Sequence, residues 1–64
     1  MWGIELSDAG GRWIDEVVVA GPIETLRDRC HGLLIAYPDA ALARLISPDG
    51  LLEYEYPEPR TEGA

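Results

Sequence analysis

The stretch GPIETLRDRCHGLLIAYP, residues 21–38, decides the fold of this chain because it has the pattern of one amphipathic helix with a defined start and end. Pro22 suits the first helical position, where its missing N–H is not needed. Pro38 ends the helix near Ala36, since it disfavours a helical conformation at the residue before it. Apolar residues recur at helical spacing within an arc of about 100°, as on a helix that lies on a sheet: Ile23, Leu26, Cys30, Leu33, Leu34 and Tyr37. We predict a helix over 22–36.

Two turn-rich segments flank this helix, one at residues 8–11 and one at residues 47–50. Each lies between short runs of β-branched, aromatic and aliphatic residues, which is the pattern of a β-hairpin. We therefore predict an α+β fold of ββαββ connectivity, a four-stranded antiparallel sheet with one helix on one face. A right-handed crossover gives the strand order 2-1-3-4. Two hairpins completed only by a partner chain are the alternative. The predicted strands lie near 2–7, 12–19, 41–47 and 51–56.

Two rules conflict over the register of the second hairpin. The turn chemistry of Ser47-Pro48-Asp49-Gly50 favours a type I turn followed by a left-handed glycine, which places Arg44 opposite Tyr54. A two-residue turn at Asp49-Gly50 instead pairs Arg44 with Glu55 and couples opposite charges across the strands. We favour the first register, and the second stays open.

The chain has 64 residues and a net charge of −7. We predict one domain over 1–56 and a disordered tail over 57–64, which holds two prolines, two glutamates and no large apolar residue. A core this small supplies only about 3–5 kcal/mol. No run approaches the roughly 20 apolar residues that span a bilayer, and the first residues lack a basic start followed by an apolar run. We expect a cytoplasmic protein that does not bind membranes.

No group of residues in the sequence carries a specific chemical motif. Cys30 and His31 are adjacent on the predicted helix and point about 100° apart, which is poor geometry for a nucleophile and its base. We interpret Cys30 as a small core hydrophobe and His31 as a surface residue. Gly10-Gly11 belongs to a hairpin, and not to a phosphate-binding loop between a strand and a helix. We expect no enzymatic activity, no metal and no cofactor.

The charged residues exclude nucleic acid as the expected ligand, because five arginines and no lysines accompany twelve carboxylates. Two classes of function then compete. We favour a small acidic accessory module that acts by occupying the surface of a partner protein. The alternative is an acidic mimic of nucleic acid that inhibits a basic DNA- or RNA-binding protein. The dispersal of the carboxylates along the chain favours the first class.

The chain has more apolar side chains than one helix can cover. In the second strand Trp13, Val17 and Val19 have the opposite parity from Ile14 and Val18, while Gly32 and Ile35 lie on the outer side of the helix. Monomers seldom expose an apolar patch above a few hundred Å². We therefore predict a homodimer anchored by Trp13. The candidate interface residues are Trp13, Val17, Val19, Ile35 and Gly32.

The segments GGRWI, VV, AGPIETLRDRC, YPDA and ARLISPDG run through most of the chain in this order. This pattern resembles short uncharacterised proteins encoded by GC-rich actinobacteria and their phages. The resemblance implies an accessory or host-interacting role, and it supplies no functional residues to transfer.

Overall fold

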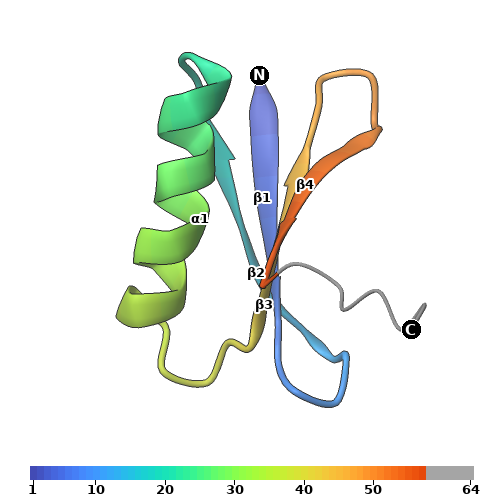
Figure 1. The fold of residues 1–64 in the computed structure, drawn as a ribbon. Helices are drawn as coiled ribbons and strands as arrows, with labels where there is room; N and C mark the ends of the chain where they lie inside the picture. Colours follow the sequence, from blue (N-terminus) through green and yellow to red (C-terminus); the bar gives the residue numbers. More distant parts are fainter. Residues whose placement is uncertain (58–64) are drawn as a thin grey trace, which may run out of the picture.

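The computed structural model describes residues 1–57, in which one helix covers one face of a sheet (Figure 1). The strands follow the order β2-β1-β3-β4, and all neighbouring pairs are antiparallel. The predicted α+β fold and strand order are thus confirmed. Apart from Pro57, the predicted tail lies outside the described residues. The elements are β1 (Trp2–Ser7), β2 (Trp13–Val19), α1 (Ile23–Ala36), β3 (Leu42–Ile46) and β4 (Leu52–Tyr56).

The core lies between α1 and the sheet face that contains Ile4 and Leu6. α1 packs mainly on β3 and makes fewer contacts with β4. Val19 belongs to this core, with 8% of its surface exposed, because it pairs with Trp2 and therefore shares the face of Ile4. Its predicted place at an exposed interface is wrong. The buried apolar residues are Ile4, Leu6, Val19, Leu26, Cys30, Ala43 and Leu45.

The ends of α1 follow from its two flanking prolines. Pro22 has an extended backbone (φ −64°, ψ 148°) and is the N-cap, so the helix begins one residue later than predicted. Its carbonyl accepts the first helical hydrogen bond from the Leu26 N–H at 3.1 Å. The helix ends at Ala36, as Pro38 predicts. No helix within residues 1–57 is long and apolar enough to cross a membrane.

The two hairpins have the same turn. In each, the N–H of the turn glycine donates to the carbonyl three residues earlier, at 3.0 Å for Gly11 and 2.9 Å for Gly50. Both glycines have φ of 85°, a conformation that other residues adopt only at a cost. The side-chain oxygens of Asp8 and Ser47 each accept the N–H four residues later, at 2.8 and 3.1 Å. The predicted turn chemistry of the second hairpin is therefore confirmed.

A β-bulge in β4 resolves the conflict over register. Next to the turn the strands pair as the turn chemistry requires, but Glu53 is an extra residue without a partner in β3. Beyond this bulge Arg44 pairs with Glu55, as the charges require. The favoured pairing of Arg44 with Tyr54 is wrong, because the bulge moves Tyr54 opposite Leu45. Each rule thus governs one half of the hairpin.

The first hairpin has a bulge at the corresponding position of its second strand, where Ile14 is the extra residue. The two hairpins therefore correspond residue by residue, and β1 and β3 pair antiparallel with Glu5 opposite Arg44, two corresponding positions. The sheet accordingly has an internal pseudo-twofold axis between these two residues. Further corresponding pairs are Gly3 and Leu42, Trp13 and Leu52, Asp15 and Tyr54, and Glu16 and Glu55.

Candidate functional site

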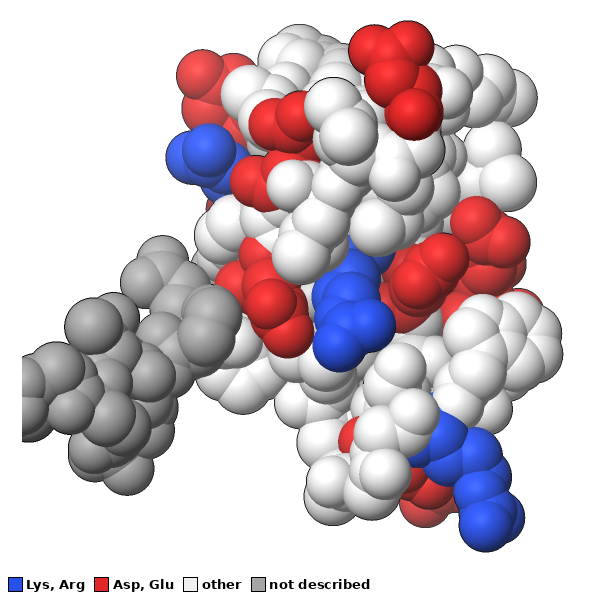
Figure 2. All heavy atoms as spheres, turned by 90° about the vertical axis from the view of Figure 1, so that its right-hand side faces the viewer, with Lys and Arg blue, Asp and Glu red and all other residues white. Residues whose placement is uncertain are grey.

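The sheet face opposite α1, which we call the uncovered face, carries a row of charged residues across all four strands. The register aligns them in the order Glu16, Glu5, Arg44 and Glu55, and we call them the charged row. Figure 2 shows this side of the molecule, with a basic group between acidic groups on either side. Polar side chains are expected on a solvated sheet face.

Apolar side chains lie on both sides of the charged row. Trp13, opposite Ser7, shares the parity of Glu5, because the bulge in β2 changes the face on which the following residues lie. Trp13 is 61% exposed and Leu52, at the corresponding position of the other hairpin, is 52% exposed. Val18 is exposed as well. The uncovered face therefore combines exposed apolar groups with fixed charges.

The charges within the row are unequally matched. Arg44 Nε lies 3.6 Å from Glu55 Oε2 and forms an ion pair. Glu5 and Glu16 face each other in register, and within residues 1–57 neither forms an ion pair. Like charges directly opposite each other destabilise a sheet. The β1–β2 half of the uncovered face therefore holds two neighbouring carboxylates, neither of which forms an ion pair within residues 1–57.

A hollow of about 210 Å³ opens on this same half, over Gly3. Val18 and Ile46 flank Gly3 on the neighbouring strands, and Pro48 of the second turn also lines the hollow. The Glu16 side chain lies over the glycine, with Oε2 only 2.7 Å from where a Cβ at position 3 would be. We call this feature the Gly3 hollow. It exists because the central strand lacks a side chain at this point.

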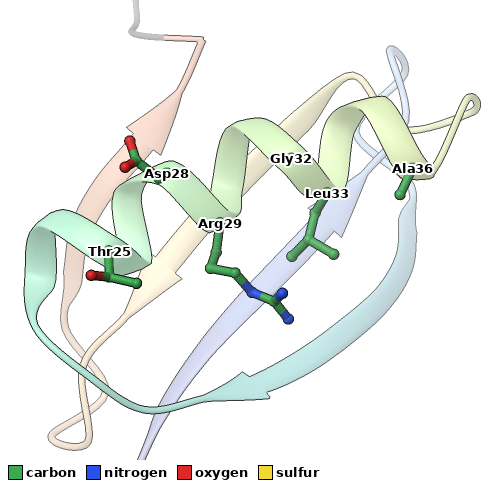
Figure 3. A pocket seen from close by; sticks show the side chains of 6 residues that line it. All are labelled: Thr25, Asp28, Arg29, Gly32, Leu33 and Ala36. Atoms are coloured by element: carbon green, nitrogen blue, oxygen red, sulfur yellow. The ribbon is translucent and has the colours of Figure 1, made fainter.

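A second hollow, of about 340 Å³, lies along the outer side of α1 (Figure 3). Arg29 and Leu33 project from one side of the helix and Asp28 from the other. A Cβ at Gly32 would meet no atom within 4 Å, so the glycine leaves open surface. All lining residues come from the helix: Thr25, Asp28, Arg29, Gly32, Leu33 and Ala36. No other element among the described residues contributes a wall to this groove.

His31 does not lie free on the surface, as the sequence suggested, but is half-buried between α1 and β4. Its Nε2 lies 2.8 Å from the Tyr54 hydroxyl, and its ring centroid lies 3.9 Å from that of Tyr56. The Arg27 guanidinium lies 5.3 Å from the centroid of the Tyr54 ring, within the range of a cation–π contact. These contacts hold the edge strand β4 against the helix.

The other edge strand has an equivalent link at the corresponding position. The Tyr37 hydroxyl donates a hydrogen bond of 3.1 Å to Asp15 Oδ2 on β2. The hydrogen bond to Asp15, together with the negative charge of its carboxylate, raises the pKa of Tyr37. Asp15 and Tyr54 are corresponding residues, so both edge strands are tied to the helix region by one polar side chain at the same point of the hairpin.

Cys30 is fully buried, which confirms its interpretation as a core hydrophobe. Burial raises the pKa of its thiol, and the nucleophilic thiolate is correspondingly disfavoured. No group of three or more histidine, cysteine or carboxylate side chains that could hold a metal ion is found among residues 1–57.

The predicted interface residues divide between two surfaces and the core. Trp13 lies on the uncovered face, while Gly32 and Ile35, the latter 83% exposed, lie on the outer side of α1. Val17 is half-buried on the helix-facing side, opposite Ile4, and Val19 is buried. Sequence reasoning did not single out Gly3, Glu16, Val18 or Leu52. The bulge in β2 determines that Glu16 and Val18 lie on the same face as Gly3.

Comparison of the chain with protein-family models, with curated proteins and with solved structures yields no match.

Proposed function

We propose that this protein is a small acidic protein-binding module whose binding surface is the uncovered face. The observation that carries the proposal is the pair of exposed apolar residues at corresponding positions, Trp13 and Leu52, on either side of the charged row. Tryptophan is among the residues that contribute most to binding when a partner buries them. The module acts by occupying a surface of its partner, as an accessory protein.

The cellular setting belongs to the same proposal. The sequence pattern supports a phage- or mobile-element-encoded protein that works in the cytoplasm of its host. The charged row offers little support for the second class of function, the nucleic-acid mimic. A mimic should present carboxylates in an unbroken series, and Arg44 lies between Glu5 and Glu55 in the row.

Capture of partners from a lysate of the source cell tests the proposal. The intact chain is compared with a variant carrying Trp13→Ser and Leu52→Ser, and with the control variant Ile35→Ser. The control removes an apolar group that is even more exposed, on the outer side of α1. We expect the double substitution to reduce capture of a specific partner by about tenfold or more, the loss typical of interface anchors. The control should capture the same partner undiminished. Equal capture by all three chains would reject the uncovered face as the binding surface.

A further inference from the structure

The two hairpins differ at corresponding positions of the charged row, whose member Glu16 lines the Gly3 hollow. In the second hairpin Arg44 lies beside Glu55 and forms an ion pair with it. In the first hairpin Glu5 occupies the position that corresponds to Arg44, and it faces Glu16. The first hairpin therefore has Glu16 at the position of Glu55, but it has a second glutamate where the second hairpin has the arginine of the ion pair.

The hollow reflects a second difference between corresponding positions. Gly3 corresponds to Leu42, so an aliphatic side chain of the second hairpin is missing from the first. The space of about 210 Å³ between Val18 and Ile46 is smaller than the roughly 300–1,000 Å³ of typical small-molecule sites. Its size suits one side chain of a larger partner.

We propose that an arginine or lysine side chain of the partner protein occupies the Gly3 hollow. Its aliphatic stem packs between Val18 and Ile46. Its cationic end binds the carboxylate of Glu16, which lies over Gly3, and that of the neighbouring Glu5. Long basic side chains commonly bury their stems against apolar surface while the charge stays at a polar edge. Cations that meet carboxylates form strong charge-assisted hydrogen bonds. The inference rests on the proposed function and adds the chemistry of the partner.

Charge complementarity favours a basic partner over a second copy of this chain. The charged row holds three glutamates and one arginine, and the whole chain has a net charge of −7. Face-to-face pairing of two copies would bring two negative surfaces together. A basic partner instead relieves the repulsion between Glu5 and Glu16 and is attracted at long range.

The first test is an NMR titration of the ¹⁵N-labelled chain with a short capped alanine peptide that has one central arginine. The control peptide has citrulline at the same place, which keeps the shape and removes the charge. We expect amide shifts to concentrate at Gly3, Glu16, Val18 and Ile46 with the arginine peptide and to be much smaller with citrulline. Equal shifts with both peptides, or shifts spread evenly over the helix and the sheet, would overturn the assignment.

Three variants separate a specific site from general attraction to an acidic protein. Glu16→Gln should weaken binding of the arginine peptide about fivefold, the upper range for an exposed ion pair. Glu24→Gln removes the same charge from the first turn of α1, so the affinity should change by less than about twofold. Gly3→Ala places a methyl group in the hollow and displaces the Glu16 carboxylate, so it should weaken binding as well. Equal effects of Glu16→Gln and Glu24→Gln would refute the site.

Failure of this inference and failure of the proposed function give different results. Suppose that capture of the partner requires Trp13 and Leu52, survives high salt and is unchanged by Glu16→Gln. This result would overturn the inference of a basic side chain in the Gly3 hollow, but not the assignment of the binding surface. Capture that is indifferent to both Trp13 and Leu52 would overturn the surface itself.

Discussion

Replacement of Tyr54 by phenylalanine tests whether the contact between His31 and Tyr54 stabilises the fold. The substitution removes the hydroxyl that lies 2.8 Å from His31 Nε2 and leaves the aromatic ring in place. A hydrogen bond of this kind contributes about 0.5–1.5 kcal/mol to stability. His31→Ala removes the same bond and also the ring contact with Tyr56, which adds about 0.5–1.5 kcal/mol. Against a total stability of about 3–5 kcal/mol, either loss is large.

A double-mutant cycle isolates the pair from other contacts of Tyr54. Urea unfolding of the intact chain, both single variants and the double variant, followed by circular dichroism, gives four free energies of unfolding. We expect a coupling energy of about 0.5–1.5 kcal/mol between His31→Ala and Tyr54→Phe. Trimethylamine N-oxide, added equally to all samples, keeps the weakest variant folded.

The matched control is a second cycle that combines Tyr54→Phe with Ile35→Ala. Ile35 is 83% exposed on the outer side of the same helix, so these two substitutions should be additive within about 0.3–0.5 kcal/mol. A coupling between His31 and Tyr54 no larger than this control would show that the link does not hold β4 against α1.

Three further predictions follow from single side chains. Gly32→Ala should raise the free energy of unfolding by about 1 kcal/mol, because alanine favours the helix over glycine and the added methyl group meets open space. The midpoint of thermal unfolding should then be about 4–8 °C higher. A lower midpoint would mean that the helix needs the glycine. The raised pKa values of Tyr37 and Cys30 mean that the folded state retains both protons more firmly than the unfolded chain. The free energy of unfolding that these two groups contribute is therefore fully present below their unfolded pKa values, about 8.5 for cysteine and 10 for tyrosine. It is lost as the pH rises through the folded values. Chemical unfolding between neutral and strongly alkaline pH should show this loss of stability, and the loss should be smaller in Tyr37→Phe. The sequence predicts self-association through Trp13, which would bring two negative faces together. Because salt screens the repulsion between them, the particle mass from light scattering at about 100 μM should rise with salt concentration. A mass that changes neither with salt nor with Trp13→Glu would contradict a dimer on this face.

The sequence was sufficient to predict the order of elements because each signal there is local. The spacing of apolar residues over 22–36 defines the helix, and the turn residues at 8–11 and 47–50 define the hairpins. The strand order follows from the handedness of a single crossover. Each of these inferences requires only neighbouring residues and one general rule of topology.

The face on which each side chain lies could not be predicted, because it depends on bulges. Side chains alternate strictly along a regular strand, and one extra residue reverses the alternation from that point on. The extra residues Ile14 and Glu53 therefore decide where Trp13 and Tyr54 lie. Neither residue has a bulge signature such as glycine. Period-two reasoning therefore assigned Val19 to the same face as Trp13, and the turn chemistry paired Arg44 with Tyr54. The Gly3 hollow depends on the same long-range register and was likewise out of reach.

The two places where the first hairpin departs from the usual rules of sheet stability lie side by side. Glycine inside a strand costs about 0.5–1 kcal/mol relative to alanine, and Gly3 lies in the central strand β1. Glutamates directly opposite each other destabilise a sheet, and Glu5 faces Glu16. The second hairpin follows both rules at the corresponding positions, with Leu42 and with the ion pair of Arg44 and Glu55. A domain with only about 3–5 kcal/mol of stability tolerates few such departures. Natural proteins concentrate them where function requires them, and the coincidence of both at the Gly3 hollow is the strongest reason to look for the partner there.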